Sequence, residues 1–183
     1  AGEFPPEGSS HYVSGELIQV DHVERKFALR VDRTDKQNRS HFDLPLGAKM
    51  LPYGSIFYHG APASLEDIPL GTHLHGEFYI REPDDDSLLI ESWHRRLTPE
   101  KDFTRCFRLE DDFSFYARQG QLWRIGAIDF DDKKLTATLS RDGEEVGEAK
   151  IFKLQDSTRV WLGSGVEEPE FLAQGQEIQL NIT

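Results

Sequence analysis

The chain has 183 residues, of which 37% are hydrophobic and 30% charged, a composition typical of globular domains rather than of disordered chains. Its net charge of −12 would repel a phosphate backbone, which disfavours general nucleic-acid binding. Every apolar run falls well short of the roughly 20 residues that a membrane-spanning helix needs. The single cysteine, Cys106, excludes an intramolecular disulfide and a cysteine-based zinc site.

Residues 1–11 are rich in proline, glycine and serine, which predicts a flexible leader. They contain neither the basic segment nor the apolar core of a signal peptide. A leader of this kind is common directly after a removed export signal. We therefore expect an exported protein of the periplasm, the cell envelope or the medium.

One hairpin pattern occurs twice. Residues 20–27 read apolar, Asp, two variable positions, acid, base, Lys, apolar, and residues 128–135 repeat this order without a gap. Alternating residues follow both copies, so each predicts two strands joined by a tight charged turn. The copies are 108 positions apart, whereas the later glycines Gly71 and Gly175 are 104 apart, so the intervening loops differ in length.

The two hairpins open two similar series of short strands. We expect an all-β fold of two tandem five-stranded small β-barrels, OB-like or SH3-like, at residues 12–80 and 119–183. Strands are expected at 11–20, 27–32, 40–44, 55–59 and 72–80, and again at 122–128, 135–139, 148–154, 158–162 and 176–182. The alternation of apolar and polar residues predicts that Leu29, Leu135 and Ile178 are buried.

Residues 81–118 are unlike both units and are expected to form a connector. Thr98 and Pro99 predict the start of a helix, with the threonine as its cap. Five aromatic side chains fall within fourteen residues: Phe103, Phe107, Phe113, Phe115 and Tyr116. A free linker would not carry so many, so we expect this connector to pack against one or both barrels.

Two phrases resemble a known class of domain. They are Gly15-Glu16-Leu17-Ile18-Gln19-Val20-Asp21, a Gly-led strand entering a Val-Asp turn, and Ala63-Ser64-Leu65-Glu66-Asp67-Ile68-Pro69-Leu70-Gly71 before the last strand of the first unit. Both are similar to segments of exported bacterial OB-like small β-barrel domains of unknown function, although Ile68 stands where that pattern has leucine. The resemblance implies an envelope or secreted barrel and supplies no catalytic residues.

The sharpest candidate for a metal site is the run His73, His75 and Glu77. Alternate residues of a strand share one face, and two imidazoles with a carboxylate could bind Zn²⁺. The other interpretation is the polar outer face of a strand. Because successive alternate side chains start roughly 6–7 Å apart, the three in a line cannot meet at one ion. We expect no tightly bound metal unless another strand supplies a ligand, with His41 or His59 first in question.

Acidic clusters are the second candidate for a metal site. Three of them occur, at 84–86, at Asp111–Asp112 and at 129–132. None has the loop pattern of an EF-hand, so calcium is not expected.

The function classes can be ranked from these patterns. Signatures of enzymes are absent: there is no Gly-x-Ser-x-Gly elbow, phosphate loop or dinucleotide fingerprint. We expect a non-enzymatic, cofactor-free binding or assembly module that recognises a protein, a peptide or an envelope glycan. One alternative is a metal-dependent protein or enzyme built on His73, His75 and Glu77. The other is a single-stranded nucleic-acid-binding OB protein, which the acidic charge disfavours.

Overall fold

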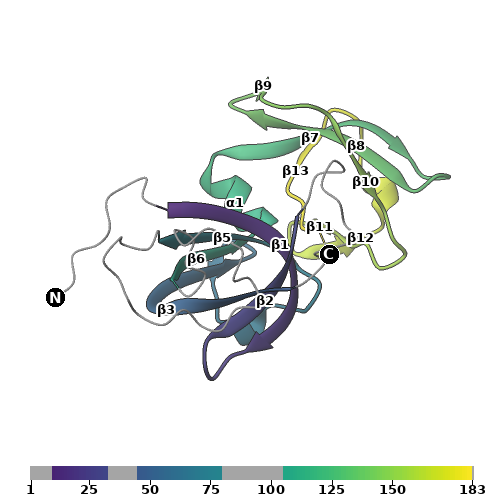
Figure 1. Cartoon of the computed structure of the whole chain (residues 1–183). Coiled ribbons are helices and arrows are strands. Elements are labelled where there is room, and N and C mark those ends of the chain that lie inside the picture. Colours follow the sequence, from purple (N-terminus) through teal and green to yellow (C-terminus); the bar gives the residue numbers. More distant parts are fainter. Residues whose placement is uncertain (1–9, 33–44, 80–104, 183) are drawn as a thin grey trace, which may run out of the picture. The chain divides into compact units, whose positions relative to one another are not determined.

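The computed structural model describes residues 10–32, 45–79 and 105–182 (Figure 1). Residues 1–9 of the expected leader, the strand at 40–44 and the helix start at Thr98 lie outside these residues, whereas Ser10 and His11, the last two residues of that leader, belong to a strand. The chain divides into two compact units, the first made of residues 1–115 with 181–183 and the second of residues 116–180. In the described parts of the chain, no helix is long and apolar enough to cross a membrane.

The first unit is built around a closed five-stranded β-barrel. Its strands are β1 (Ser10–Asp21), β2 (Lys26–Val31), β3 (Leu46–Tyr58), β5 (His73–Tyr79) and β6 (Cys106–Asp111), and the two-residue β4 (Ala61–Pro62) pairs with the end of β3. The order β2-β1-β5-β6-β3 closes because β2 also pairs with β3. All neighbours are antiparallel except β3 and β6. The predicted β-barrel is confirmed for this unit, and its closing strand β6 comes from the segment expected to be a connector.

The barrel is filled by one side of each strand. Leu17, Leu29, Leu74 and Leu109 have no exposed surface, as the period-two alternation predicts for Leu29. Gly15 allows β1 and β2 to approach, because a Cβ at this position would lie 2.3 Å from the carbonyl oxygen of Arg30. A short 3₁₀ turn, η2 (Leu65–Asp67), adds Leu65 and Ile68 to the same core.

The second unit is an open sheet. It contains β7 (Gln121–Asp129), β8 (Lys134–Arg141), β9 (Glu144–Glu145), β10 (Lys150–Lys153), β13 (Glu177–Ile178), the hairpin β11 (Val160–Leu162) with β12 (Gly165–Glu167), and the 3₁₀ turn η3 (Pro169–Phe171). The pairing order is β10-β8-β7-β13, and its two end strands do not pair with each other among the described residues. The predicted second closed barrel is therefore not confirmed. The helix α1 (Asp112–Arg118) spans the boundary of the two units.

The repeated hairpin has the same geometry in both units. In each turn the aspartate accepts a bond from the backbone N–H three residues on: Asp21 Oδ1 from Glu24 at 3.0 Å, and Asp129 Oδ1 from Asp132 at 2.8 Å. The base before the second strand has positive φ in both, 54° at Arg25 and 51° at Lys133. Both hairpins also carry a bulge at the same place in the first strand, between residues 17 and 19 and between 125 and 127.

The repeat continues into the closing strands. Gly71 N donates to the carbonyl of Leu17 at 2.8 Å, and Gly175 N donates to that of Ile125 at 2.7 Å. Strands β1 and β5 pair antiparallel, as β7 and β13 do. The second unit differs because no described strand takes the place of β6 between its two edges. The sheet consequently stays open where the first unit closes.

The core of the second unit is smaller than that of the first. Ile125 and Leu135 are each only 1% exposed, so the predicted burial of Leu135 is confirmed. Ile178 is only half-buried, packed against this core instead of inside it. The reason is that β13 is a two-residue edge strand with a neighbour on one side only.

Candidate metal centre

Strand β5 presents two histidines on one side and the barrel core on the other. Leu74 and Phe78 are fully buried in the core. His73 and His75 extend from the alternate positions, and the side chain of His75 is only 4% exposed. Their rings meet edge to face with centroids 5.0 Å apart. The two histidines share one face because alternate residues of a strand point to the same side, as expected from the sequence.

The third member of the cluster is Asp112, at the first position of α1. Strand β6 runs antiparallel to β5 with Asp111 opposite Leu74, which brings the next residue level with the two histidines. The Oδ1 atom of Asp112 lies 2.8 Å from Nδ1 of His73 and 2.9 Å from Nε2 of His75. One ligand atom from each of the three residues lies within 4.8 Å of the others.

The outward-facing nitrogen of each histidine also has a partner. Nε2 of His73 donates to Oδ2 of Asp32 at 2.7 Å, and the Ser14 hydroxyl donates to the same oxygen at 2.6 Å. Nδ1 of His75 lies 2.5 Å from the hydroxyl of Tyr12. Both imidazoles are therefore fixed in rotation by groups on β1 and just beyond β2.

Phe115 packs against the second histidine. Its ring lies parallel to that of His75, with centroids 3.8 Å apart and 2° between the planes. The stacking covers one face of the imidazole and contributes to its burial. It also joins the fourth residue of α1 to strand β5.

Asp111, the neighbouring acid, is an anchor for backbone and amide groups. Its Oδ1 accepts from Ser114 N, and its Oδ2 accepts from His59 N and from Nδ2 of Asn181, all at 2.8–2.9 Å. It has no exposed surface. Its three donors belong to the β3–β4 turn, the helix α1 and the C-terminal segment, so this carboxylate joins three parts of the first unit.

The electrostatics of the cluster favour ionised groups. Burial lowers the pKa of His73, but hydrogen bonds to Asp112 and Asp32 outweigh it and raise that pKa to about 9. Burial raises the pKa of Asp112, yet the bonds from the two histidines bring that pKa below its usual value. Asp32 behaves likewise: burial raises its pKa, but hydrogen bonds from His73 and Ser14 outweigh burial and bring that pKa below its usual value. Without a metal, His73 is thus a cation between two carboxylates.

Two other candidate ligands, Glu77 and His59, lie outside the cluster. Glu77 lies two positions further along β5 and is not a member of the cluster. His59 packs its ring between Tyr58 and Phe113, with centroids 4.2 and 6.0 Å away. His41 lies outside the described residues. Asp112 was visible in the sequence only as half of an acidic pair, and its partnership with β5 depends on strand pairing across 39 positions.

No protein-family model, curated protein or solved structure was found to match this chain. The chemistry of the first unit therefore has to be inferred from its own residues.

The second unit supplies an internal comparison. Glu177 starts β13 as His73 starts β5, and each pairs with the corresponding residue of the preceding hairpin strand. Its Oε1 accepts from Arg124 at 2.9 Å and from the Ser140 hydroxyl at 3.0 Å. This position carries an ordinary surface ion pair, so the histidine cluster is particular to the first unit among the described residues.

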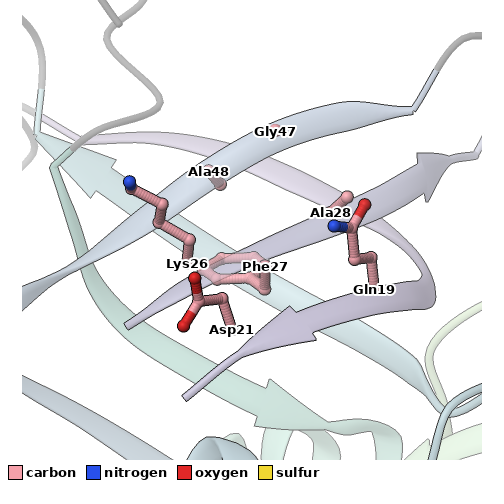
Figure 2. A pocket seen from close by; sticks show the side chains of 7 residues that line it. All are labelled: Gln19, Asp21, Lys26, Phe27, Ala28, Gly47 and Ala48. Carbon is pink, nitrogen blue, oxygen red and sulfur yellow. The ribbon is translucent and has the colours of Figure 1, made fainter. Parts of the chain in front are cut away.

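A small hollow lies beside Gln19 and Asp21, at the end of β1 away from Tyr12 and Ser14. Figure 2 shows the side chains that line it. It has a volume of about 200 Å³ and lies over β1, β2 and β3. Its lining residues are Gln19, Asp21, Lys26, Phe27, Ala28, Gly47 and Ala48. None of them belongs to the histidine cluster.

Proposed function

We propose that the first unit binds a divalent transition-metal ion through Nδ1 of His73, Nε2 of His75 and Oδ1 of Asp112. The observation that carries the proposal is the convergence of one ligand atom from each residue within 4.8 Å of the others, with Oδ1 of Asp112 2.8 and 2.9 Å from the two nitrogens. Nitrogen and oxygen ligands stand about 2.0–2.2 Å from Zn²⁺, so ligand atoms around one ion are roughly 3–3.5 Å apart. Small side-chain shifts would bring the three atoms to those positions.

The donor set suits a particular group of ions. Two imidazoles and one carboxylate are ligands of Zn²⁺ and of Fe²⁺ or similar ions, and they leave at least one position for water. An isolated aspartate and two neutral histidines would not suit Ca²⁺ or Mg²⁺, which prefer all-oxygen ligands. We therefore propose a first-row transition ion.

The surroundings of the histidines support the same assignment. A metal-bound histidine generally donates its other ring N–H to a carboxylate or another acceptor, which fixes its orientation. Asp32 provides such an acceptor for His73, and the Tyr12 oxygen provides one for His75. Burial also raises the pKa of the Tyr12 phenol, so this group remains neutral and does not compete for the ion.

A structural or regulatory ion fits the burial better than a catalytic one. The side chains of Asp112 and His75 are 2% and 4% exposed. A substrate would need room beside the metal, and the hollow of Figure 2 is lined by none of these residues. We therefore propose an ion that organises the barrel, with water at its remaining coordination position.

Cobalt spectroscopy tests the ligand set. Metal-free protein titrated with Co²⁺ should develop visible absorption that saturates at one ion per chain, since Co²⁺ occupies zinc sites and reports a low coordination number. The signal should be lost in His75→Ala and Asp112→Asn and kept in Glu77→Gln. Retention in Asp112→Asn with loss in Glu77→Gln would assign the set expected from the sequence. Absence of any stoichiometric signal in the unmodified protein would refute the proposal.

The exposed pair Trp161 and Val166 favours a second function, in the second unit. These residues stand opposite each other on the β11–β12 hairpin and are 66% and 50% exposed. We propose that they form the contact face of an exported binding module for an envelope glycan, because an exposed indole can stack on a sugar ring. Cosedimentation with insoluble peptidoglycan should be lost in Trp161→Ala and kept in Leu162→Ala, which changes an equally apolar neighbour. Equal sedimentation of both variants would reject this function.

A further inference from the structure

The two chain crossings between the units both adjoin the proposed metal centre. The first unit ends at Phe115 and resumes at Asn181. Phe115 stacks on His75, as described above. On the return crossing, residues 181 and 182 bond to groups of the cluster and to its acidic neighbour. The segment Asn181–Ile182 is called the C-terminal latch below.

The latch is attached to the barrel through its backbone. Ile182 N donates to Oδ2 of Asp112 at 2.9 Å. In return, His73 N donates to the carbonyl of Ile182, also at 2.9 Å. These two bonds join one latch residue to both a carboxylate ligand and the backbone of a histidine ligand.

The side chain of Asn181 attaches the latch a second time. Its Nδ2 donates to Oδ2 of Asp111 at 2.8 Å, and its Oδ1 accepts from Phe113 N at 2.9 Å. The amide therefore satisfies a backbone donor in the first turn of α1, where such groups lack helical partners. It also holds the helix start, and with it Asp112, in place.

Asp112 connects the latch to the ion because its two oxygens have different partners. Oδ1 faces His73 and His75, while Oδ2 accepts from the latch. When the latch holds the Asp112 carboxylate, that group has already lost its rotational freedom. The ion then binds without the entropy cost of fixing the carboxylate, and the same holds in reverse. Each interaction should consequently favour the other, and linkage requires the effect to be reciprocal.

We infer that the C-terminal latch is a regulatory element coupled to the metal centre: the bound ion secures the latch, and the docked latch strengthens ion binding. The inference rests on the proposed metal function. Residues 116–180 connect to the first unit through Phe115 and Asn181, so the ion would restrain both connections. The backbone N–H of Ile182 acts as a positioning group for the carboxylate ligand.

A matched pair of variants tests one direction of the coupling. Ile182→Pro removes the N–H that bonds to Asp112, whereas Ile182→Ala keeps it and changes only the side chain. Competition with a chelating dye measures Zn²⁺ affinity in the full chain. Loss of a group that orients a ligand typically weakens metal binding about 10–100-fold. We expect that loss in Ile182→Pro and a change of less than about threefold in Ile182→Ala.

Amide hydrogen exchange tests the other direction without any variant. Zn²⁺ should slow exchange of the Ile182 amide, and reciprocity predicts a factor similar to the affinity loss in Ile182→Pro. As a control, the Gly175 amide, bonded within the second unit, should not respond. The exchange measurement uses the unmodified chain, so it tests the coupling even if Ile182→Pro fails to fold.

The outcomes separate the inference from the function on which it rests. Zn²⁺ binding with unchanged exchange at Ile182 would overturn the latch and leave the metal centre standing. No Zn²⁺ binding in the unmodified chain would overturn the metal centre itself. Slowed exchange with equal affinities in both folded variants would show that the ion acts on the latch through a group other than the Ile182 N–H, and would reject the positioning role.

Discussion

Oδ1 of Asp112 lies 2.8 Å from Nδ1 of His73, although the two residues are 39 positions apart in the chain. This relationship converts a pair of histidines on a strand into a three-residue cluster. It depends on the pairing of β5 with β6, which also closes the barrel. The formation of the site and the closure of the fold therefore depend on the same strands.

Replacement of Asp112 should destabilise the metal-free protein. Asp112→Asn removes the buried carboxylate that His73 and His75 share, and breaking a buried charged pair typically costs about 3 kcal/mol. We expect that loss in the free energy of unfolding, measured with urea in the presence of a chelator. Glu177→Gln is the control, because its exposed ion pair with Arg124 is screened by solvent and should contribute little to stability. Similar small losses in both variants would show that the cluster adds little to stability.

The metal-free protein should lose stability toward alkaline pH. The pKa of His73 is raised from 6.5 to about 9 on folding, so its contribution is fully present below pH 6.5 and is lost as the pH rises through 9. The pKa values of Asp112 and Asp32 are lowered, so their contributions are present above about pH 4 and are lost in acid. Melting temperatures in a chelator should peak between these limits.

The variant His73→Gln isolates the alkaline part of this profile. It should be less stable than the unmodified chain at pH 6 and should show a flatter decline between pH 6.5 and 9. Zn²⁺ should also flatten the decline of the unmodified chain, because metal ligands bind in the deprotonated form. An alkaline slope that His73→Gln leaves unchanged would assign the titration to another group.

The turns of the two hairpins could be predicted from the sequence because their geometry is decided within a few residues. Asp21 and Asp129 each accept a hydrogen bond from the backbone N–H three positions on. The aspartate at the same place in both copies of the pattern is the sequence sign of this turn. Burial of Leu29 and Leu135 followed from alternation alone. These features need no knowledge of distant contacts.

The closure of the barrel and the site could not be predicted in this way. Strand β6 is short and lies in a segment without a repeat. Its position between β3 and β5 is decided by contacts with residues far away in the sequence. Asp112 comes close to the two histidines only because β6 pairs with β5. The sequence did place His73 and His75 together, but the third partner comes from another element and not from Glu77 on the same strand.

Two glycines should differ in how much stability they lose when alanine replaces them. Gly15→Ala would place its Cβ 2.3 Å from the Arg30 carbonyl oxygen, and relieving such crowding typically costs about 1–3 kcal/mol. Gly47→Ala meets no atom within 4 Å and should be nearly neutral. Chemical unfolding of both variants checks this. A neutral Gly15→Ala would mean that β1 and β2 do not approach as closely as described.

Truncation of apolar side chains should distinguish buried from half-buried positions. Leu29→Ala and Leu135→Ala each remove a side chain that is at most 1% exposed, and we expect losses of roughly 2–5 kcal/mol. Ile178→Ala should cost less, because this residue lies at the edge of its core. Urea unfolding monitored by tryptophan fluorescence gives the ranking. A loss at Ile178 as large as that at Leu135 would contradict it.

The most direct test of the metal centre is an anomalous difference map from crystals grown with Zn²⁺ and recorded at the zinc absorption edge. We predict one strong peak about 2.0–2.2 Å from Nδ1 of His73, Nε2 of His75 and Oδ1 of Asp112. Contacts of the two imidazoles with Asp32 and Tyr12 should persist. A fully occupied zinc elsewhere, or an empty cluster with Asp112 still hydrogen-bonded to both histidines, would contradict the proposal and leave a proton-linked ion pair in its place.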